Sequence, residues 1–451
     1  MKKLKGVVLI GQSGGPTSVI NASAAGVFLE ALKHPEQVTG VYGAVHGIKG
    51  ILNEEFYDIT KEDPKELELL KNTPASMIGS VRYKLADPKI DATDYQRLVE
   101  VFKKYNIRFF FYNGGNDSMD TAHKISEFMK ESGWDCTVIG IPKTIDNDLS
   151  GTDHSPGYGS AAKYVATTLM ELYHDATVYD TKQVTIVEIM GRNAGWLTAA
   201  SQLAIEKGQG PDLVYLPEQV FDYDKFFSDV KATLDKQGKV IVAISEGVKD
   251  AEGKYIPEHY QELKTDSFGH AQLGGTATIL AQQVQAELNV KVRAIEFSLM
   301  QRSAAQLASK VDVREAFNAG AKGVREALKG TTDKMVAFKR ISSNPYKMKY
   351  VLVPLQVAAN TEQKVPQEWI LPNNKGLSKD FVEYALPLIQ GDDKAPLEDG
   401  LPRFAQLKLI RVPKKLDVIG QSIRFFLKSI EKCPNHQQRQ QQEQQCCVEQ
   451  G

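Results

Sequence analysis

The chain has 451 residues, and a usual size of about 150 residues per domain predicts two or three domains. Its composition, 42% hydrophobic and 25% charged with 35 glycines, is typical of a globular α/β protein and excludes disordered, fibrous and membrane classes. The net charge of −1 excludes an overall basic field that attracts nucleic acid or acidic membranes. We therefore expect no nucleic-acid or membrane partner, and any anion site has to be built locally.

Targeting signals and cysteines indicate the compartment. No apolar run approaches the ~20 residues that a membrane-spanning helix needs, and we expect no signal peptide. Cys136 is the one cysteine in the part expected to fold, while Cys433, Cys446 and Cys447 lie near the end without metal-ligand spacing. This cysteine usage predicts a reducing, cytoplasmic location.

The first elements in chain order form a β-loop-α unit. Residues 6–10 read as a strand, followed by a Gly/Ser/Pro turn and a helix rich in small residues at about 19–32. The same order recurs at 107–112, a β-branched and aromatic run that ends at two glycines and precedes a helix reaching Met129.

Further apolar runs follow at 136–141, 184–189 and 240–244, and each is apolar throughout, as expected of parallel strands buried on both faces. A helix at about 304–328 and an apolar run at 350–354 indicate that the second half returns to complete the sheets. The alternation predicts an α/β fold of two Rossmann-like domains facing a shared cleft. Ligands are expected at the carboxyl ends of the strands.

Two glycine-rich turns are candidates for binding phosphate. The turn SGGPT at 13–17 follows the first strand, where glycines let backbone amides approach an anion at the start of a helix. A strand-to-helix connection without any ligand looks the same, so this turn alone leaves both interpretations open. The second turn, GGNDS at 114–118, follows another buried strand. Two amide-rich turns at one edge of a sheet favour phosphate binding.

The segment PKTIDND at 142–148 places a cation, a hydroxyl group and two carboxylates directly after a strand. In an extended segment, Asp146 and Asp148 point the same way. One of them can then accept a proton from a substrate hydroxyl while the other helps place Mg²⁺, and Lys143 meets the phosphates. The alternative is a polar turn with Asx capping, which gives no reason for Lys143 and Thr144.

These motifs and the later sequence Met190-Gly191-Arg192 stand in the order found in phosphofructokinases, which the chain resembles over about residues 4–330. In detail the chain is similar to the pyrophosphate-dependent branch of that family. The resemblance implies a phosphofructokinase-like fold. It also implies a glycolytic, reversible transfer of a phosphoryl group from pyrophosphate, with Mg²⁺, to the 1-hydroxyl of D-fructose 6-phosphate, giving fructose 1,6-bisphosphate and phosphate.

The resemblance also implies roles for individual residues. Asp146 matches the base that takes the proton of the sugar hydroxyl, and the other catalytic candidates are Lys143, Thr144 and Asp148. The donor-binding candidates are Gly14, Gly15, Arg82, Gly115, Asp117, Ser118 and Lys143. The substrate-binding candidates are Thr144, Asp146, Met190, Gly191, Arg192, Glu246, Arg293 and Arg302.

Two positions favour pyrophosphate as the donor. The ATP-using members usually carry glycine where this chain has Asp117 and Lys143. A carboxylate in the place of a nucleotide's α-phosphate adds bulk and a repelling like charge. Pyrophosphate has no such group, and Lys143 offers it a point charge. An ATP-dependent 6-phosphofructokinase is the alternative, and a sugar-phosphate-binding protein without turnover is a further one.

The chain departs from the family pattern at two places. The metal-linked aspartate after the second glycine pair is Asn116 here, so Asn116 and Asp148 remain as the candidate protein ligands of Mg²⁺. Gln183 replaces an arginine that contacts sugar in a neighbouring subunit. Family members are usually homodimers or homotetramers, and we expect the same of this chain. Acceptance of sedoheptulose 7-phosphate stays open.

We expect residues 1–150 to bind the phosphoryl donor and residues 151–416 to bind the sugar phosphate, with the chain crossing back to the first domain. Residues 417–451 are expected to be a disordered tail, since seven glutamines stand between positions 437 and 445. The Gly/His segment at 266–275 is a candidate for closing over substrate, although a lone histidine such as His270 is more often a structural residue.

Overall fold

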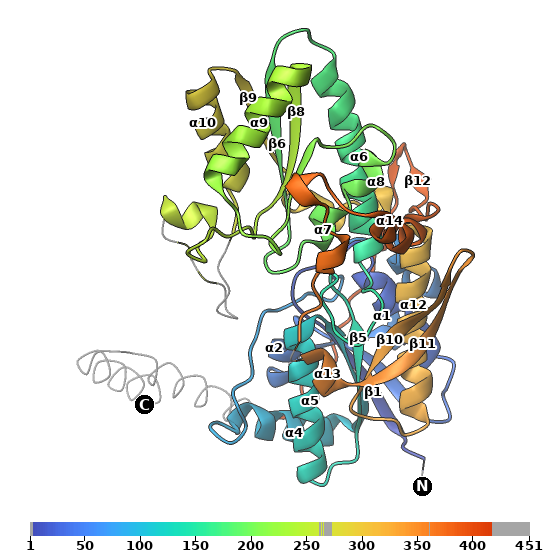
Figure 1. Cartoon of the computed structure of the whole chain (residues 1–451). Helices are drawn as coiled ribbons and strands as arrows, with labels where there is room; N and C mark the ends of the chain where they lie inside the picture. The colour runs from blue at the N-terminus through green and yellow to red at the C-terminus, as the bar shows by residue number, and fades with distance from the viewer. Residues whose placement is uncertain (1–2, 261–262, 264, 266–272, 360, 417–451) are drawn as a thin grey trace, which may run out of the picture.

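The computed structural model describes residues 3–260, 263, 265, 273–359 and 361–416 (Figure 1). The Gln-rich tail and residues 266–272 of the Gly/His segment lie outside the described residues, so both expectations stay predictions. Helices and strands alternate to form two lobes, each built around a sheet (Figure 1). Among the described residues, no helix has the length and apolar character needed to cross a membrane.

The larger sheet has seven strands in the order β11-β10-β5-β4-β1-β2-β3. Its parallel strands are β1 (Gly6–Gln12), β2 (Val38–Ala44), β4 (Ile107–Gly114) and β5 (Thr137–Pro142). The short strand β3 (Phe56–Asp58) runs antiparallel at one edge. At the other edge, β10 (Lys334–Ser343) pairs with β5 in parallel and with β11 (Tyr346–Pro354) in antiparallel direction. The chain therefore returns from its second half to complete this sheet.

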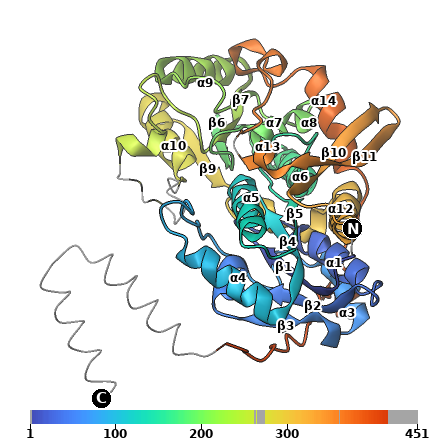
Figure 2. The ribbon, with the colours of Figure 1, turned by 90° about the horizontal axis from the view of Figure 1, so that it is seen from below.

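Strand β1 explains why this sheet is covered on both faces. Val7 and Leu9 pack into one core cluster, while Val8 and Ile10 pack into another, because successive side chains of a strand point to opposite faces. One face is covered by α2 (Gly47–Leu52), α4 (Thr93–Tyr105), α5 (Asn116–Glu131) and α13 (Leu355–Ala359). The other is covered by α1 (Ile20–Ala31), α3 (Pro64–Leu69) and α12 (Lys310–Leu328) (Figure 2).

The small residues predicted in the first helix let α1 and α12 pack backbone to backbone. A Cβ atom placed on Gly26 would lie 2.0 Å from the carbonyl oxygen of Phe317, and one on Gly320 would lie 2.1 Å from that of Ser23. Helix α12 begins at Lys310 and not near 304, because the Ser309 side chain caps its first turn.

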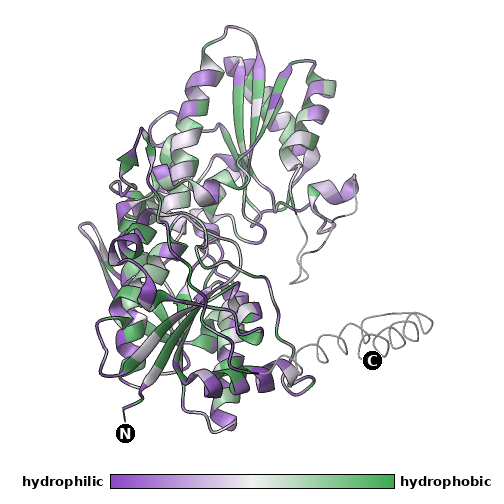
Figure 3. Cartoon of the chain, turned by 180° about the vertical axis from the view of Figure 1, so that it is seen from behind, coloured by the Kyte–Doolittle hydropathy of each residue, from purple (hydrophilic) through white to green (hydrophobic). Residues whose placement is uncertain are grey.

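The smaller sheet has four parallel strands in the order β7-β8-β6-β9. They are β6 (Gln183–Ile189), β7 (Leu213–Tyr215), β8 (Lys239–Ser245) and β9 (Lys291–Glu296). Helices α9 (Tyr223–Gln237) and α10 (Thr276–Leu288) cover one face. The other is covered by α6 (Tyr158–Thr177), α7 (Trp196–Ala199), α8 (Gln202–Ile205) and α14 (Lys379–Ala385). Figure 3 shows apolar residues along the strands and polar residues on the outer helix faces.

Short elements complete the described part. They are α11 (Met300–Ser303), β12 (Leu397–Glu398), β13 (Leu401–Pro402) and the 3-10 helices η1 (Ile59–Lys61), η2 (Leu70–Asn72), η3 (Ile256–His259), η4 (Ala305–Leu307), η5 (Gln367–Trp369), η6 (Pro372–Asn374) and η7 (Leu386–Ile389). The smaller sheet is parallel and the larger one is parallel except for its edge strands β3 and β11, and helices cover both faces of each, which confirms the predicted α/β class.

Candidate active site

Most of the predicted site residues follow the carboxyl ends of strands in both sheets, whereas Arg82 precedes α4, Arg293 lies within β9 and Arg302 lies in α11. In the larger sheet they follow β1, β4 and β5, and in the smaller sheet they follow β6 and β8. Parallel strands place these ends at one edge of a sheet, where ligands of open α/β folds bind.

Three cationic side chains meet at the first glycine turn. Lys143 is buried, and its Nζ donates to the carbonyl oxygen of Gly15 at 2.7 Å. A Cβ atom placed on Gly15 would lie 3.0 Å from Arg302 Nη1 and 3.9 Å from Arg82 Nη2. Gly14 has a φ of +77° and a Cβ there would lie 3.3 Å from Lys143 Nζ, so the turn favours glycine. A chain of net charge −1 thus gathers three positively charged side chains at one turn.

The second glycine turn lies against the first. A Cβ atom on Gly114 would lie 2.0 Å from Ser118 Oγ and 3.3 Å from the Cβ atom of Ser13. Gly115 is the residue before helix α5, and the backbone N–H of Lys143 donates to the carbonyl oxygen of Gly114 at 3.1 Å. Asp117 lies half-buried in the first turn of α5. The two turns and Lys143 therefore form one continuous surface.

Asp146 is surrounded by positive charge. Burial raises its pKa above the ordinary value, while the charges of Lys143, Arg192, Arg82 and Arg302 act in the opposite direction. Its backbone N–H donates to the side chain of Thr144 at 3.1 Å. A carboxylate whose pKa is raised above the ordinary value suits a general base. Thr144, which is buried, shapes the turn that carries it.

The pKa values of Lys143 and Asp148 are shifted toward neutral pH. Burial lowers the pKa of Lys143 to about 8, and the nearby charges of Arg82 and Arg302 add to this effect. Burial, followed by the charges of Asp146 and Glu362, raises the pKa of Asp148 to about 7. Such shifts mark candidate functional sites when they occur together in one place.

Several residues expected to hold the sugar phosphate follow strands of the smaller sheet. The N–H of Gly191 donates to Glu246 Oε1 at 3.4 Å, and the N–H of Met190 donates to Gln301 Oε1 at 3.2 Å. Burial raises the pKa of Glu246 to about 7, with Asp146 adding to the shift. Arg192 Nε is buried without a hydrogen-bond partner among the described residues, so this group is available to a ligand.

Arg293 is not brought to this site within one chain. It lies in β9 opposite Thr185 of β6, toward the amino end of the strand, and it pairs with Asp175 at the end of α6. Arg302, by contrast, reaches the turn at Gly15 and therefore lies beside the candidate donor-binding residues. The two predicted phosphate-binding arginines are thus separated, although both follow from the same motif.

A segment after α13 brings residues to the site that the sequence did not reveal. The amide of Asn193, next to Arg192, donates to Glu362 Oε1 at 2.9 Å. The N–H of Gln363 donates to the carbonyl oxygen of Asp148 at 2.8 Å, and Trp196 Nε1 donates to that of Gln363 at 2.8 Å. This segment links the Asp148 turn to the loop after β6. It carries no periodic pattern or glycine signal that could have revealed its place.

The candidate metal residues fit an ion that is bound together with a phosphate substrate. Asn116 Nδ2 donates to Asp148 Oδ2 at 2.9 Å, and among the described residues Asn116 Oδ1 is buried without a partner. Within the described ranges, no group of three or more His, Cys, Asp or Glu side chains could hold a metal alone. Mg²⁺ is typically held by one or two protein oxygens, water and phosphate oxygens, which matches this arrangement.

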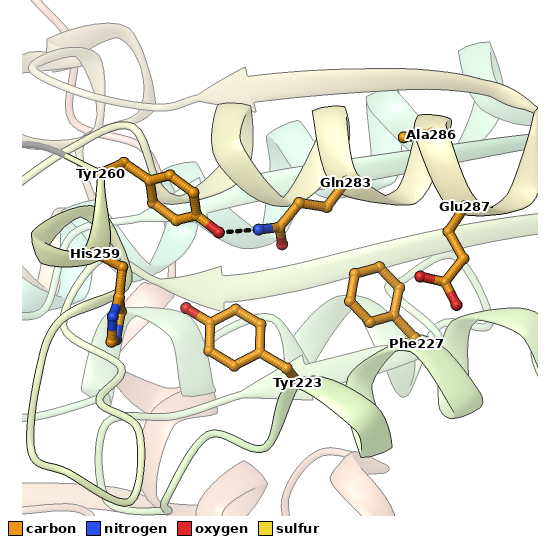
Figure 4. A pocket seen from close by; sticks show the side chains of 7 residues that line it. All are labelled: Tyr223, Phe227, His259, Tyr260, Gln283, Ala286 and Glu287. Atoms are coloured by element: carbon orange, nitrogen blue, oxygen red, sulfur yellow. Dashed lines mark hydrogen bonds between the residues drawn. The ribbon is translucent and has the colours of Figure 1, made fainter.

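A shallow groove of about 660 Å³ lies elsewhere on the smaller lobe, between α9, η3 and α10 (Figure 4). Its described lining includes none of the predicted site residues: it is lined by Tyr223, Phe227, His259, Tyr260, Gln283, Ala286 and Glu287. The cluster formed by Lys143, Asp146 and Asp148 therefore lies outside this groove.

Comparisons with known proteins define the class. Residues 7–296 match the family model described as Phosphofructokinase, and the chain belongs to the phosphofructokinase family. The chain is 42% identical to the pyrophosphate–fructose 6-phosphate 1-phosphotransferase of Halomonas elongata, over 90% of this chain and 97% of that protein. It is 45% identical to the enzyme of the same name from Xanthomonas campestris pv. campestris, over 91% and 98%.

A solved structure agrees with these relatives. The crystal structure of the pyrophosphate-dependent phosphofructokinase from Marinobacter aquaeolei matches with a TM-score of 0.82 and 38% identity, covering 92% of this chain and 99% of that chain. The phosphofructokinase-like fold predicted from the motifs is therefore confirmed, well beyond the part that carries them.

Proposed function

We propose that this chain is a pyrophosphate-dependent 6-phosphofructokinase. It transfers a phosphoryl group from pyrophosphate to the 1-hydroxyl of D-fructose 6-phosphate and gives fructose 1,6-bisphosphate and phosphate. The observation that carries this proposal is the meeting of Lys143, Arg82 and Arg302 at the glycine turn with Asp146 beside them. Relatives with this named activity match about nine-tenths of the chain at 42% and 45% identity.

The donor assignment rests on Lys143 and Asp117. Lys143 Nζ lies against Gly15, where its compact charge suits a small, highly charged donor. Asp117 stands in the first turn of α5, directly after the second glycine turn. A carboxylate at this place adds bulk and like charge against the α-phosphate of a nucleotide, and pyrophosphate lacks that group.

Phosphoryl transfer asks an enzyme mainly for positioning and charge neutralisation. Lys143 and Arg82 neutralise the negative charge of the donor phosphates. This neutralisation reduces the repulsion between the phosphates and the nearby carboxylates. Asp146 accepts the proton of the sugar hydroxyl as that oxygen attacks the phosphorus atom in line. Arg192 and Glu246 orient the acceptor, Arg192 through the buried Nε that is left without a partner among the described residues.

Phosphofructokinases generally need a divalent metal ion, and we assign Mg²⁺ to this chain. Asn116 and Asp148 are the protein groups that would hold it, since their side chains are hydrogen-bonded to each other and each carries an oxygen that can bind a cation. When bound, such an ion neutralises negative charge on the donor. The side chains of Asn116 and Asp148 keep each other oriented through their hydrogen bond.

The larger lobe is assigned to donor binding and the smaller lobe to the sugar phosphate, with residue 150 as the expected boundary. Strands β10 and β11 belong to the larger sheet although they follow residue 330 in sequence, as the expected crossing back requires. A cytoplasmic location is part of the same proposal. It is supported by the cysteine usage of the sequence, in which Cys136 is the one cysteine of the part expected to fold.

The assay that tests the activity supplies purified protein with fructose 6-phosphate and Mg²⁺, and with pyrophosphate or ATP in separate reactions. Formation of fructose 1,6-bisphosphate with pyrophosphate, and far less with ATP, is expected. Faster turnover on ATP would assign the chain to the ATP-dependent enzymes. Tight binding of fructose 6-phosphate without product from either donor would make it a binding protein.

We also propose a homodimer or homotetramer in which the open edge of the smaller sheet meets a second copy. Edge strand β9 carries the partly exposed Arg293, and Val178 and Tyr179 nearby are 66% and 52% exposed. In such an assembly, Arg293 serves an interface and not its own site. Light scattering should give a multiple of 50.0 kDa, and R293A should raise the KM for fructose 6-phosphate. A monomeric active enzyme would contradict this arrangement.

A further inference from the structure

Asn147 stands between Asp146 and Asp148, and both polar atoms of its side chain are hydrogen-bonded. It is 1% exposed and has a φ of +57°, a left-handed conformation that asparagine tolerates better than most residues. Its Nδ2 donates to Tyr384 Oη at 2.7 Å, and its Oδ1 accepts from the N–H of Ser155 at 2.9 Å. These two bonds hold the peptide units on either side, which lead directly to the two carboxylates.

Tyr384 reaches this turn from helix α14, which lies where the two lobes meet (Figure 1). Its hydroxyl accepts from Asn147 and donates to the carbonyl oxygen of Asp153 at 2.9 Å. The guanidinium of Arg340 lies 4.8 Å from the centre of its ring, and Arg340 Nη1 donates to its carbonyl oxygen at 2.9 Å. Tyr384 is therefore held at its ring, its backbone and its hydroxyl.

A buried ion network fixes Tyr384 in turn. Arg340 donates to both oxygens of Asp153, and His154 contacts Asp153 and Glu315 at 2.7 Å each. Burial acts to lower the pKa of His154. The contacts with Glu315 and Asp153 outweigh burial and raise this pKa to about 9. His154 is thus protonated at neutral pH, and two cations balance two anions. Tyr346 completes the network by donating to Glu315 at 3.0 Å. Networks satisfied in this way are rigid.

We propose that Tyr384 is a positioning residue whose hydroxyl, acting through Asn147, keeps the Asp146–Asp148 turn in the geometry that phosphoryl transfer needs. The inference rests on the proposed function. It follows from the contacts above, because Asn147 is the one residue that separates the two carboxylates in sequence. Tyr384 lies outside residues 7–296, where the family match is found, so no family motif points to it. A displacement of about 1 Å at a reacting group can cost ~10²-fold in rate.

The test compares Y384F with Y346F in the assay with pyrophosphate and fructose 6-phosphate. Both variants remove one hydroxyl from the same network, but of these two tyrosines Tyr384 is the one that contacts Asn147. We expect Y384F to lower kcat about 10- to 100-fold with both KM values within about two-fold. We expect Y346F to keep kcat within about two-fold. Melting temperatures of both variants report their losses of stability.

A second variant, N147G, keeps the left-handed backbone accessible and removes both side-chain bonds. If Tyr384 acts through Asn147, the double variant Y384F/N147G should be no slower than N147G alone. Losses that multiply would overturn the proposal. Should N147G fail to fold, the comparison of kcat between Y384F and Y346F still tests whether Tyr384 positions the turn.

The outcomes separate this proposal from the proposed function. An inactive wild-type enzyme counts against the function and leaves no rate to compare. An active wild type with an unimpaired Y384F overturns the positioning role and leaves the function intact. Equal loss of kcat in Y384F and Y346F also overturns it, since the network then acts only through stability.

Discussion

The proposed donor side and the proposed acceptor side of the candidate site are built by different means. On the donor side, Lys143 contacts Gly15, and Arg82 and Arg302 reach the same turn. All of these groups are placed by one chain. On the acceptor side, Arg192 lies near Asp146, whereas Arg293 lies on an open sheet edge and pairs with Asp175.

The difference follows from sheet geometry. Strands β1, β4 and β5 are adjacent and parallel, so the turns that follow them have to meet. On the smaller sheet, β9 is an edge strand, and the backbone groups along its outer side have no partner strand among the described residues. A donor site can therefore be complete in a monomer. The acceptor site as predicted cannot include Arg293 without a second copy.

The largest expected effect tests whether the two sides meet at Asp146. Replacing Asp146 by Asn keeps the size of the side chain and removes the proton acceptor. We expect D146N to lower kcat by at least ~10²-fold with little change in either KM, because both substrates still bind. Steady-state kinetics with each substrate varied in turn gives these values. An Asp146→Asn enzyme of normal rate would remove this residue as the base.

The pH dependence of kcat/KM for pyrophosphate tests the role of Lys143 on the proposed donor side. Lys143 has a folded pKa lowered to about 8, so its charge is present below that pH and is lost as the pH rises through it. We expect kcat/KM for pyrophosphate to fall above about pH 8. K143R keeps its charge throughout this range, so its descending limb should move to higher pH. If the descending limb of the pH profile stayed at the same pH in K143R, the fall in kcat/KM would come from another group or from the substrate.

A smaller effect tests donor choice. Asp117→Gly removes bulk and negative charge at the start of α5, so kcat/KM for ATP should rise. Because Asp117 is half-exposed, we expect a gain of only about 10-fold, further increased when Lys143→Gly is added. A matched control is Asp120→Ala, one turn further along α5, where Asp120 pairs with Lys124. Equal gains in both variants would show a general charge effect and contradict the account.

The donor side was predictable from sequence because its signals are local. A buried strand followed by glycines, or by PKTIDND, fixes both the element and its chemical groups, and the structure brings Lys143, Asp146 and both turns together. Arg302 was placed in the site by resemblance, but its position beside Gly15 depends on how α11 packs. That position could not be read from spacing.

The residues that support the site were not predictable, because they are distant in sequence. Tyr384 follows Asn147 by more than two hundred residues, and a tyrosine in an amphipathic helix carries no mark of its partner. Strand β2 was also missed, since its sequence VTGVYGA contains glycines that weaken a strand pattern. Such positions are decided by tertiary packing.

The smallest expected effect concerns the segment that links the two sides. Glu362 accepts a hydrogen bond from Asn193 on the acceptor side, and its charge raises the pKa of Asp148 on the donor side. E362Q keeps an acceptor for Asn193 and removes the charge, whereas E362A removes both. The bond is exposed and worth about 1 kcal/mol at most, so E362A should raise the KM for fructose 6-phosphate only about three-fold, and E362Q less. The side-chain amide introduced by E362Q still offers the oxygen that Asn193 needs. If E362Q raised the KM for fructose 6-phosphate as much as E362A, the charge of Glu362 and not its hydrogen bond to Asn193 would therefore determine this KM.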